Sequence, residues 1–163
     1  MSPKTGERLT HVAGDGTARM VDVSAKPDSA RMARATGWIS MNRATHDAIA
    51  ANTIAKGDVL AVARLAGIMG AKRTSDLIPL CHPLPLTDVS VTLSTDHQLP
   101  GVRVEAVARS VGKTGVEMEA LTAVSVALLT VYDMAKAMDR GMTIGDISLT
   151  EKSGGASGDF ARG

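Results

Sequence analysis

A chain of 163 residues with 44% hydrophobic and 21% charged residues has the composition of an ordinary globular domain, long enough to bury a core without disulfides. Its formal net charge of +1 argues against a general polyanion binder, and its three aromatic residues are too few for a surface that stacks nucleic-acid bases. One cysteine cannot form an internal disulfide, and the amino terminus lacks the apolar core of a signal peptide. We therefore expect a cytoplasmic protein that binds neither nucleic acid nor a membrane.

The first half of the chain predicts a strand followed by a helix. Residues 1–20 are polar and lack a periodic apolar pattern, so we expect a flexible arm there. The pattern then favours a strand over residues 33–41 and a helix over residues 59–73, with Asp58 as the N-cap residue of that helix. Prolines at positions 79, 83 and 85 are expected to stop the helical pattern.

The second half predicts a β-hairpin and a second helix. Hydrophobicity alternates with period two over residues 89–93 and 102–107, and a polar loop ending in Pro-Gly joins these two runs. Thr114 and Glu117 have the spacing of a capping box, which predicts a helix that starts there and continues to about Asp139, before a glycine.

A last strand over residues 143–149 completes the order strand, helix, strand, strand, helix, strand. This order predicts the α+β class and a ferredoxin-like split βαβ fold (βαββαβ), an antiparallel sheet with two helices on one face. We expect a single domain over residues 21–152. The glycine-rich tail, residues 153–163, is expected to be flexible, with backbone amides that can approach an anion closely.

The second helix carries no charge between Ala120 and Tyr132. This run is shorter than the ~20 residues that span a bilayer, so it indicates a buried helix. A helix that is apolar on every side must be covered on every side, and in a two-layer domain the sheet covers only one side. We therefore expect a second subunit on the other side, which makes the protein a homo-oligomer. Small residues at positions 66, 67, 70 and 71 also favour close helix contact.

Two charged clusters can be structural or functional. Asp133 and Lys136 are three residues apart on one helix face, as in an exposed ion pair or a catalytic pair. Glu117 and Glu119 stand near a helix amino end, where the helix dipole alone favours acidic residues. The residue types leave both interpretations open.

The segment around Cys81 and His82 does not have the pattern of a metal site, because a zinc site needs about four ligands at regular spacing. Adjacent residues in an extended segment point in opposite directions, which argues against a nucleophile and its base. Cys81 is then a small buried hydrophobe, and His82 is either a structural or a ligand-binding histidine. Pro79 and Pro83 make the segment rigid before any ligand arrives.

The predicted fold also says which candidates meet. The two helices run antiparallel, so Lys56, before the first helix, should neighbour Asp133 and Lys136 at the end of the second. Lys72 and His82 should lie with Glu117 at the opposite end, roughly 24 Å away by the rise of sixteen helical residues. One small site cannot use both groups from one chain, so a two-fold interface would have to bring them together.

Seven stretches of the sequence resemble the MoaC family of molybdenum cofactor biosynthesis proteins, the cyclic pyranopterin monophosphate synthases. The stretches are residues 20–24, 56–59, 71–74, 77–84, 114–121, 132–136 and 152–155. The resemblance implies a lyase that converts 3',8-cyclo-7,8-dihydroguanosine 5'-triphosphate into cyclic pyranopterin monophosphate and diphosphate. It also implies a homohexamer, a trimer of dimers, with active sites at the dimer interface, and it makes the predicted single domain the catalytic domain.

The resemblance assigns roles to twelve residues. By position, the catalytic residues would be Asp133, Lys136 and Lys56. The residues that bind the substrate would be Leu80, Cys81, His82, Glu117, Met118 and Glu119, together with the basic residues Arg31, Lys72 and Lys152 at the triphosphate. No redox cofactor and no resident metal are expected, although Mg²⁺ can accompany the triphosphate.

The chain departs from the family pattern at two positions. Ala156 stands where the family usually has a lysine in the tail, which removes an amine that could contact phosphate, and Ala135 stands where the family often has a cysteine. The first departure leaves room for a second interpretation, a non-catalytic oligomeric nucleotide-binding protein of the same fold, because a fold alone does not determine a function.

Overall fold

A computed structural model describes residues 15–163 of the chain. The arm predicted for residues 1–20 lies mostly outside these residues. Five antiparallel strands form one sheet in the order β2-β3-β1-β4-β5. The strands are β1 (Ser29–Ser40), β2 (Leu86–Asp96), β3 (Gly101–Gly112), β4 (Thr143–Ser153) and β5 (Phe160–Ala161).

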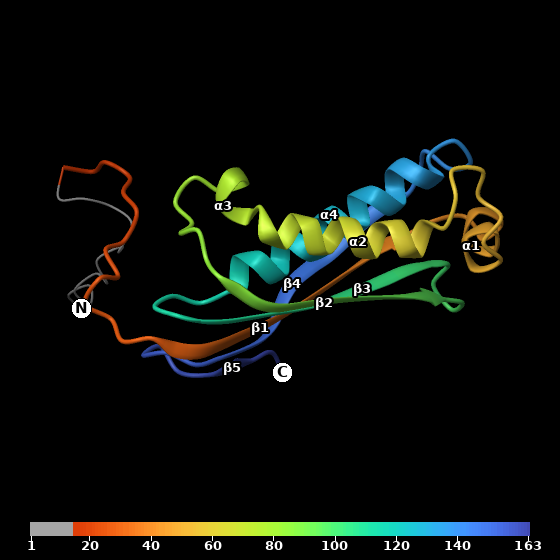
Figure 1. Ribbon diagram of the computed structural model, residues 1–163. Helices are drawn as coiled ribbons and strands as arrows, with labels where there is room; N and C mark the ends of the chain where they lie inside the picture. The colour runs from red at the N-terminus through yellow and green to blue at the C-terminus, as the bar shows by residue number, and fades with distance from the viewer. Residues whose placement is uncertain (1–14) are drawn as a thin grey trace, which may run out of the picture.

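The two long helices, α2 (Val59–Lys72) and α4 (Glu117–Ala135), lie side by side on one face of this sheet, as Figure 1 shows. The first four strands alternate with these helices in the predicted order βαββαβ, and their positions in the sheet are those of the split βαβ fold. The predicted ferredoxin-like fold is confirmed. Two short helices, α1 (Arg43–Ala50) and α3 (Thr74–Leu77), add to it.

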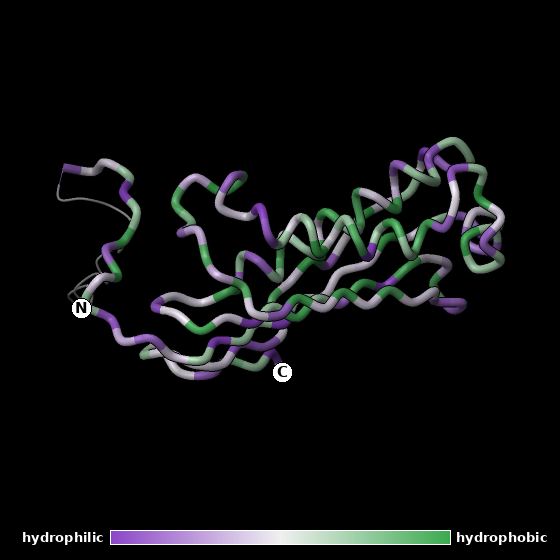
Figure 2. The backbone as a smooth tube through the Cα atoms, viewed as in Figure 1, coloured by the Kyte–Doolittle hydropathy of each residue, from purple (hydrophilic) through white to green (hydrophobic). Residues whose placement is uncertain are grey.

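The sheet separates an apolar face from a polar one. Along β1, Ala33, Ala35 and Ile39 are fully buried in the core beneath the helices, whereas the intervening side chains, such as Arg34 and Thr36, are only half-buried. This is the period-two pattern of a strand with one covered face. Figure 2 shows the same alternation of hydrophobic and hydrophilic residues along the strands.

Small residues allow α2 and α4 to approach closely, as the sequence predicts. A Cβ atom added to Gly67 would lie 2.9 Å from the Ala123 carbonyl oxygen, and one added to Gly70 would lie 2.8 Å from a methyl group of Val126. Alanine at either position would therefore force the helices apart. With 19 residues, α4 is long and apolar enough to cross a membrane, but 56% of its apolar stretch is buried inside the domain, as expected of a core helix.

The predicted start of α2 is confirmed, and the helix ends one residue before the predicted end. The Asp58 carboxylate caps the helix by accepting from the Ala61 N–H at 2.9 Å. The helix ends at Lys72, before the prolines. The Thr74 hydroxyl donates to the Ala71 carbonyl oxygen at 2.9 Å, and the short helix α3 begins at Thr74. A side chain that bonds to the preceding turn competes with regular helix propagation.

Both ends of α4 differ from the prediction. The capping box does not form, because the helix begins only at Glu117 and no side chain caps its N-cap residue, Val116. The helix ends at Ala135 instead of Asp139. The Asp139 carboxylate accepts from the Asn42 N–H at 2.8 Å and from a second backbone N–H in the following turn, so this residue fastens the turn to the start of α1.

Besides α3, two elements have no counterpart in the sequence prediction. Helix α1 is capped by the Asn42 side chain, which accepts from the Thr45 N–H at 2.8 Å, and it buries Ile49 against the core. Strand β5 pairs with the end of β4. The carboxy-terminal tail, expected to be flexible, thus folds back onto the sheet.

Candidate active site

The first candidate cluster lies where the start of α2 meets the end of α4. The Lys56 ammonium donates to the Asp133 carbonyl oxygen at 2.8 Å and lies 3.3 Å from its carboxylate. The Lys136 ammonium lies 2.6 Å from the other carboxylate oxygen. The predicted proximity of these three residues, the Lys56–Asp133–Lys136 cluster, is therefore present.

Two cations hold one carboxylate in this cluster. Hydrogen bonds from Lys136 and then Lys56 lower the pKa of Asp133 below its ordinary value. Asp133 therefore stays ionised near neutral pH and fixes the positions of both amines. All three side chains are about half exposed, so the cluster faces outward, where a ligand or another subunit can reach it.

The second candidate cluster is a cavity of about 280 Å³ beneath the proline-rich segment. It is named here the His82 pocket. The residues that line it include the predicted substrate-binding residues Leu80, Cys81, His82, Glu117, Met118 and Glu119. The His82 Nε2 atom lies 2.8 Å from the Val21 carbonyl oxygen, so the segment before β1 orients the ring. The structure therefore brings together six residues from two distant stretches of sequence.

Glu119 is the most unusual ionisable group in the His82 pocket. It is only 4% exposed, and burial raises the pKa of its carboxyl to about 6, with a smaller contribution from the negative charge of Glu117. Burial, together with the nearby Glu119, also raises the pKa of the Cys81 thiol. Glu119 can therefore exchange a proton near neutral pH, whereas Cys81 stays a neutral thiol and is not an activated nucleophile.

The third candidate cluster is a larger cavity of about 790 Å³ between β1, β4 and the segment after β3. It is named here the cationic pocket, because four cations and only one acid line it: Lys26, Arg31, Lys113, Lys152 and Glu117. Such a surplus of positive charge suits a ligand with several negative charges.

The cations of this pocket are held by backbone atoms and by short side chains. Arg31 Nε donates to the Gly112 carbonyl oxygen at 3.2 Å, and the Lys113 ammonium donates to the Ser24 carbonyl oxygen at 2.7 Å. The Lys152 ammonium lies 3.6 Å from the Glu117 carboxylate. Backbone carbonyl oxygens do not neutralise a cation, so Arg31 and Lys113 keep their charge for a ligand.

The His82 pocket and the cationic pocket adjoin each other, since Lys26, Thr114, Gly115 and Glu117 line both of them, and together they are named here the double pocket. A ligand with an apolar or ring-shaped part and an anionic part can occupy the two together. The Lys56–Asp133–Lys136 cluster is not part of this double pocket. Figure 1 shows why: the start of α4 and the segment after α3 lie at one end of the molecule, and the end of α4 lies at the other.

Comparison with known proteins finds relatives along most of the chain. The sequence profile of the MoaC family matches residues 20–155. A protein of Parvibaculum lavamentivorans named cyclic pyranopterin monophosphate synthase is 61% identical over 94% of this chain and 96% of its own length. A protein of Brucella ovis with the same name is 60% identical over 94% of this chain and 93% of its own length.

The chain belongs to the MoaC family. The resemblance noted in seven short stretches thus extends over almost the whole chain.

Within this MoaC-family chain, Lys72 is the one predicted site residue that lies outside all three clusters. It lines a separate cavity of about 380 Å³ with residues of β2, and only Leu84 borders both this cavity and the His82 pocket. Lys72 and the phosphate-binding candidates Arg31 and Lys152 therefore do not share a pocket within one subunit.

Two lysines of the cationic pocket were missed by the sequence prediction. Lys26 stands two residues after the matching stretch 20–24, and Lys113 directly precedes the matching stretch 114–121. A search for basic residues beside the matching stretches would have found both. Nothing in their local spacing predicts that they meet, because the contact depends on how the segment before β1 crosses the end of β3.

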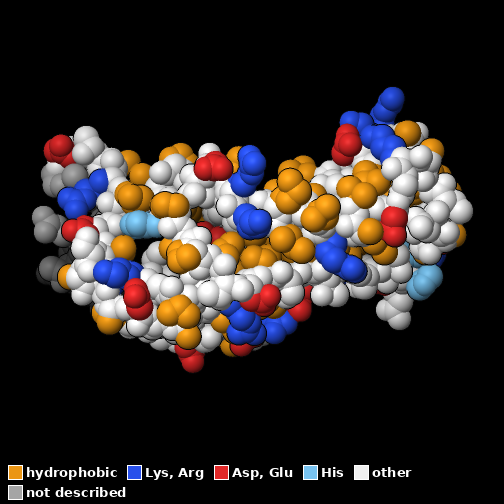
Figure 3. All heavy atoms as spheres, viewed as in Figure 1, with side chains coloured by type: hydrophobic (Ala, Val, Ile, Leu, Met, Phe, Trp, Pro, Cys, Tyr) orange, Lys and Arg blue, Asp and Glu red, His pale blue; other side chains and the backbone are white. Residues whose placement is uncertain are grey.

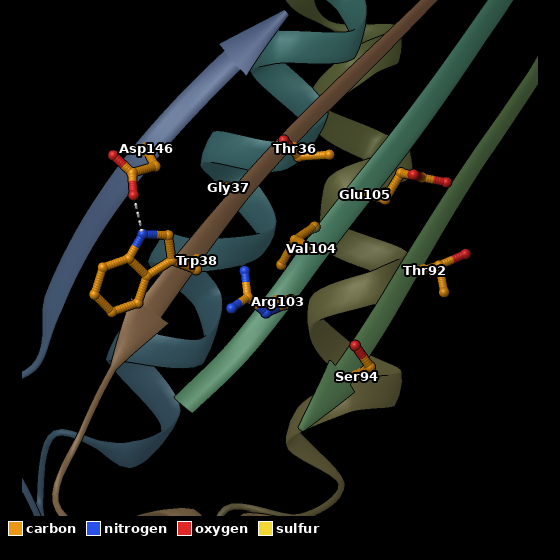
Figure 4. A pocket seen from close by; sticks show the side chains of 9 residues that line it. All are labelled: Thr36, Gly37, Trp38, Thr92, Ser94, Arg103, Val104, Glu105 and Asp146. Carbon is orange, nitrogen blue, oxygen red and sulfur yellow. Dashed lines mark hydrogen bonds between the residues drawn. The ribbon is translucent and has the colours of Figure 1, made fainter. Parts of the chain in front are cut away.

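A further cavity, of about 440 Å³, lies on the open face of the sheet and contains no predicted site residue (Figure 4). Two of its charged groups are in ion pairs: Glu105 bonds to Arg34 at 2.7 Å, and Arg103 bonds to Asp96 at 2.7 Å. Trp38 Nε1 donates to the Asp146 carboxylate at 2.6 Å, and because the indole is neutral, Asp146 keeps its negative charge. The free charge of this cavity is therefore a carboxylate, which does not suit an anionic ligand.

Within residues 15–163, no three His, Cys, Asp or Glu side chains gather in a way that could hold a metal ion. Cys81 and His82 are neighbours in the His82 pocket, with carboxylates beside them but no metal-binding geometry. The ionisable groups that line the site suit proton transfer and the binding of anions.

Proposed function

We propose that this chain converts 3',8-cyclo-7,8-dihydroguanosine 5'-triphosphate into cyclic pyranopterin monophosphate and releases diphosphate, in molybdenum cofactor biosynthesis. The observation that carries this proposal is the 61% identity to a cyclic pyranopterin monophosphate synthase over 94% of the chain. The double pocket supports it, because a ring-binding cavity that adjoins a cationic cavity suits a substrate with a fused ring and a triphosphate. The alternative, a nucleotide-binding protein without activity, has no observation of comparable weight.

The reaction requires a ring to open, protons to move between nitrogen and carbon atoms, and a cyclic phosphate to close as diphosphate leaves. We assign proton transfer to Lys56 and Lys136, with Asp133 holding both amines in place. Glu119 is a second proton carrier, because its pKa of about 6 lies close to neutral pH. Arg31 and Lys152 would stabilise the charge on the departing diphosphate.

The complete site is proposed to form between two subunits. The Lys56–Asp133–Lys136 cluster and the double pocket lie at opposite ends of α4, which has 19 residues and is therefore about 28 Å long. No ligand of nucleotide size reaches both ends within one chain. A two-fold axis that runs two copies of α4 antiparallel would place the cluster of one subunit against the double pocket of its partner.

The outer surface of the helices supports such an assembly. Val62, Leu65 and Met69 on α2 and Leu129 on α4 are each between 44% and 59% exposed, and Figure 3 shows hydrophobic side chains gathered along this layer. Large apolar side chains in a row on one face are typical of an interface. We propose a homohexamer built as a trimer of dimers, in keeping with the family resemblance.

No cofactor is assigned to the reaction, and Mg²⁺ is proposed only as a companion of the triphosphate. We propose a cytoplasmic location, as suits a biosynthetic enzyme with a nucleotide-derived substrate. We also propose that residues 21–152 form the catalytic domain and that residues 153–163 form an accessory tail.

The function is tested by the release of diphosphate from the cyclic nucleotide. The wild-type protein should release it, and Asp133→Ala should lower turnover by about a hundredfold or more, because both lysines lose the group that positions them. Glu105→Ala is the matched control, since it breaks an ion pair of similar length, 2.7 Å against 2.6 Å, on the open face of the sheet. Turnover of Asp133→Ala equal to that of Glu105→Ala would contradict the assignment.

A further inference from the structure

The last residue of β4 and the first part of the connection to β5, residues 153–157, line the cationic pocket and are named here the tail loop. It is anchored at both ends. Lys152 pairs with Phe160 in the sheet, and the Arg162 N–H donates to the Thr150 carbonyl oxygen at 2.9 Å. Gly154 and Gly155 have positive φ angles of 90° and 89°, a conformation that glycine adopts without strain. The loop therefore has a definite shape before any ligand binds.

Gly155 approaches the guanidinium group of Arg31. A Cβ atom added to Gly155 would overlap Arg31 Nη1. On its other side, Arg31 Nε donates to the Gly112 carbonyl oxygen at 3.2 Å. The guanidinium is thus confined between two stretches of backbone, and only a residue without a side chain leaves room for it at position 155.

Ser157 holds the second cation of the loop. The Lys152 ammonium donates to Ser157 Oγ at 2.7 Å and lies 3.6 Å from the Glu117 carboxylate. Lysine is flexible, so its position depends on the partners that it finds. Without the hydroxyl of Ser157, the Lys152 ammonium would move toward the Glu117 carboxylate. That carboxylate would then neutralise the charge of Lys152.

We propose that Gly155 and Ser157 are positioning residues, which hold Arg31 and Lys152 in place for the oxygen atoms of a polyphosphate. The proposal rests on the proposed function for the source of that polyphosphate, the triphosphate of the substrate. Ala156 carries no charge, so the tail loop of this chain acts only through the cations that it places. The loop thereby sets the affinity for the anionic part of the ligand.

The test uses inorganic triphosphate as the probe and isothermal titration calorimetry of the full-length protein. Gly155→Ala should raise the Kd by about tenfold, since the Arg31 guanidinium loses one charge-assisted contact. Gly158→Ala is the matched control: Gly158 also has a positive φ, 70°, but an added Cβ meets no atom within 4 Å. It should change the Kd by less than about twofold, because no cation moves.

A second variant background distinguishes the loss of Arg31 positioning from general damage to the protein. In Arg31→Ala, the further change Gly155→Ala should leave the Kd unchanged, because the group that Gly155 positions is gone. Equal weakening by Gly155→Ala in both backgrounds, or equal effects of Gly155→Ala and Gly158→Ala, would overturn the proposal.

Ser157 provides an independent test if Gly155→Ala does not fold. Ser157→Ala should raise the Kd several-fold, and Ser157→Thr, which keeps the hydroxyl, should restore it. Failure of Ser157→Ala to weaken binding would contradict the role proposed for Ser157.

Wild-type protein that does not bind triphosphate would overturn the whole proposal. Protein that binds triphosphate in this pattern but releases no diphosphate would contradict the proposed function and leave the positioning role intact.

Discussion

Glu119 shows how burial can give an ordinary residue an unusual property. Two acids stand near the start of α4, but their surroundings differ. The side chain of Glu117 is about one-third exposed and lies near Lys152, whereas Glu119 is 4% exposed and lies in the His82 pocket. Burial raises the pKa of Glu119 to about 6. The helix dipole, which the sequence offered as an explanation of both acids, does not distinguish them.

The raised pKa predicts a pH-dependent cost in stability. Between pH 4.5 and about 6, the folded protein keeps the Glu119 proton while the unfolded chain releases it, so stability falls as the pH rises. The difference of about 1.5 pKa units corresponds to about 2 kcal/mol, fully expressed above pH 6. Glu119→Gln removes this cost, so its free energy of unfolding relative to wild type should rise by about 2 kcal/mol from pH 4 to pH 7.

Urea unfolding at fixed protein concentration measures this difference at each pH. Glu117→Gln makes the same chemical change at a more exposed position two residues away, so it is the control for the substitution itself. A difference between Glu119→Gln and wild type that stays constant with pH would mean that the pKa of Glu119 is the same in the folded protein as in the unfolded chain. Its role as a second proton carrier would then be untenable.

At the scale of elements, the contact between α2 and α4 depends on glycine. Gly70→Ala gains about 1 kcal/mol of helix propensity. It also forces a Cβ against the branched side chain of Val126, at 2.8 Å, and such overpacking costs about 1–3 kcal/mol. We expect net destabilisation of about 1 kcal/mol, because a β-branched side chain in a helix has almost no other rotamer to adopt.

Removing the branched side chain of Val126 should make Gly70→Ala stabilising instead of destabilising. In a Val126→Ala background, Gly70→Ala should stabilise the protein by up to about 1 kcal/mol, since only the propensity gain remains. Thermal or urea unfolding of the wild type, the two single variants and the double variant gives this double-mutant cycle. The same sign in both backgrounds would mean that Val126 does not limit the distance between the helices.

The sequence predicted the elements whose signals are local. The Asp58 cap, the hairpin of β2 and β3 and the core helix α4 each follow from a pattern within a few residues, and each is present. The ends of α4 were wrong because distant groups determine them. Asp139 bonds to the Asn42 N–H, 97 residues earlier in the chain, and Glu117 lies close to Lys152.

The same distinction applies to the candidate site. The contact between Lys56 and Asp133 was predictable, because the direction of two helices in a known order decides it. The gathering of Lys26 and Lys113 was not predictable, because both lie in irregular segments whose path depends on the whole fold. Helices and strands have a fixed geometry, so a sequence pattern in them predicts which residues meet. Loops have no fixed geometry, so their sequence predicts such contacts much less well.

At the scale of the whole molecule, one chain holds two half-sites that face different ends. The Lys56–Asp133–Lys136 cluster has the groups for proton transfer, and the double pocket has cavities and anion-binding groups. The proposed reaction uses both kinds of group. The exposed apolar row on α2 and α4 lies between them and would be buried by the same contact that joins them.

A mixture of two inactive variants tests this arrangement. Asp133→Ala damages one half-site and His82→Ala damages the other, so each homo-oligomer should be inactive. After subunit exchange, half of the dimers are hybrids, and each hybrid contains one intact site out of two. Random mixing in equal amounts should therefore restore about a quarter of wild-type diphosphate release, because a two-fold interface builds each site from both subunits.

Exchange is verified by native mass spectrometry of differently tagged subunits. Mixing two preparations that carry the same Asp133→Ala change is the control and should restore nothing. Full exchange without recovery would mean that each site is built within one chain, so that some large movement would have to bring the two ends of α4 to the same ligand.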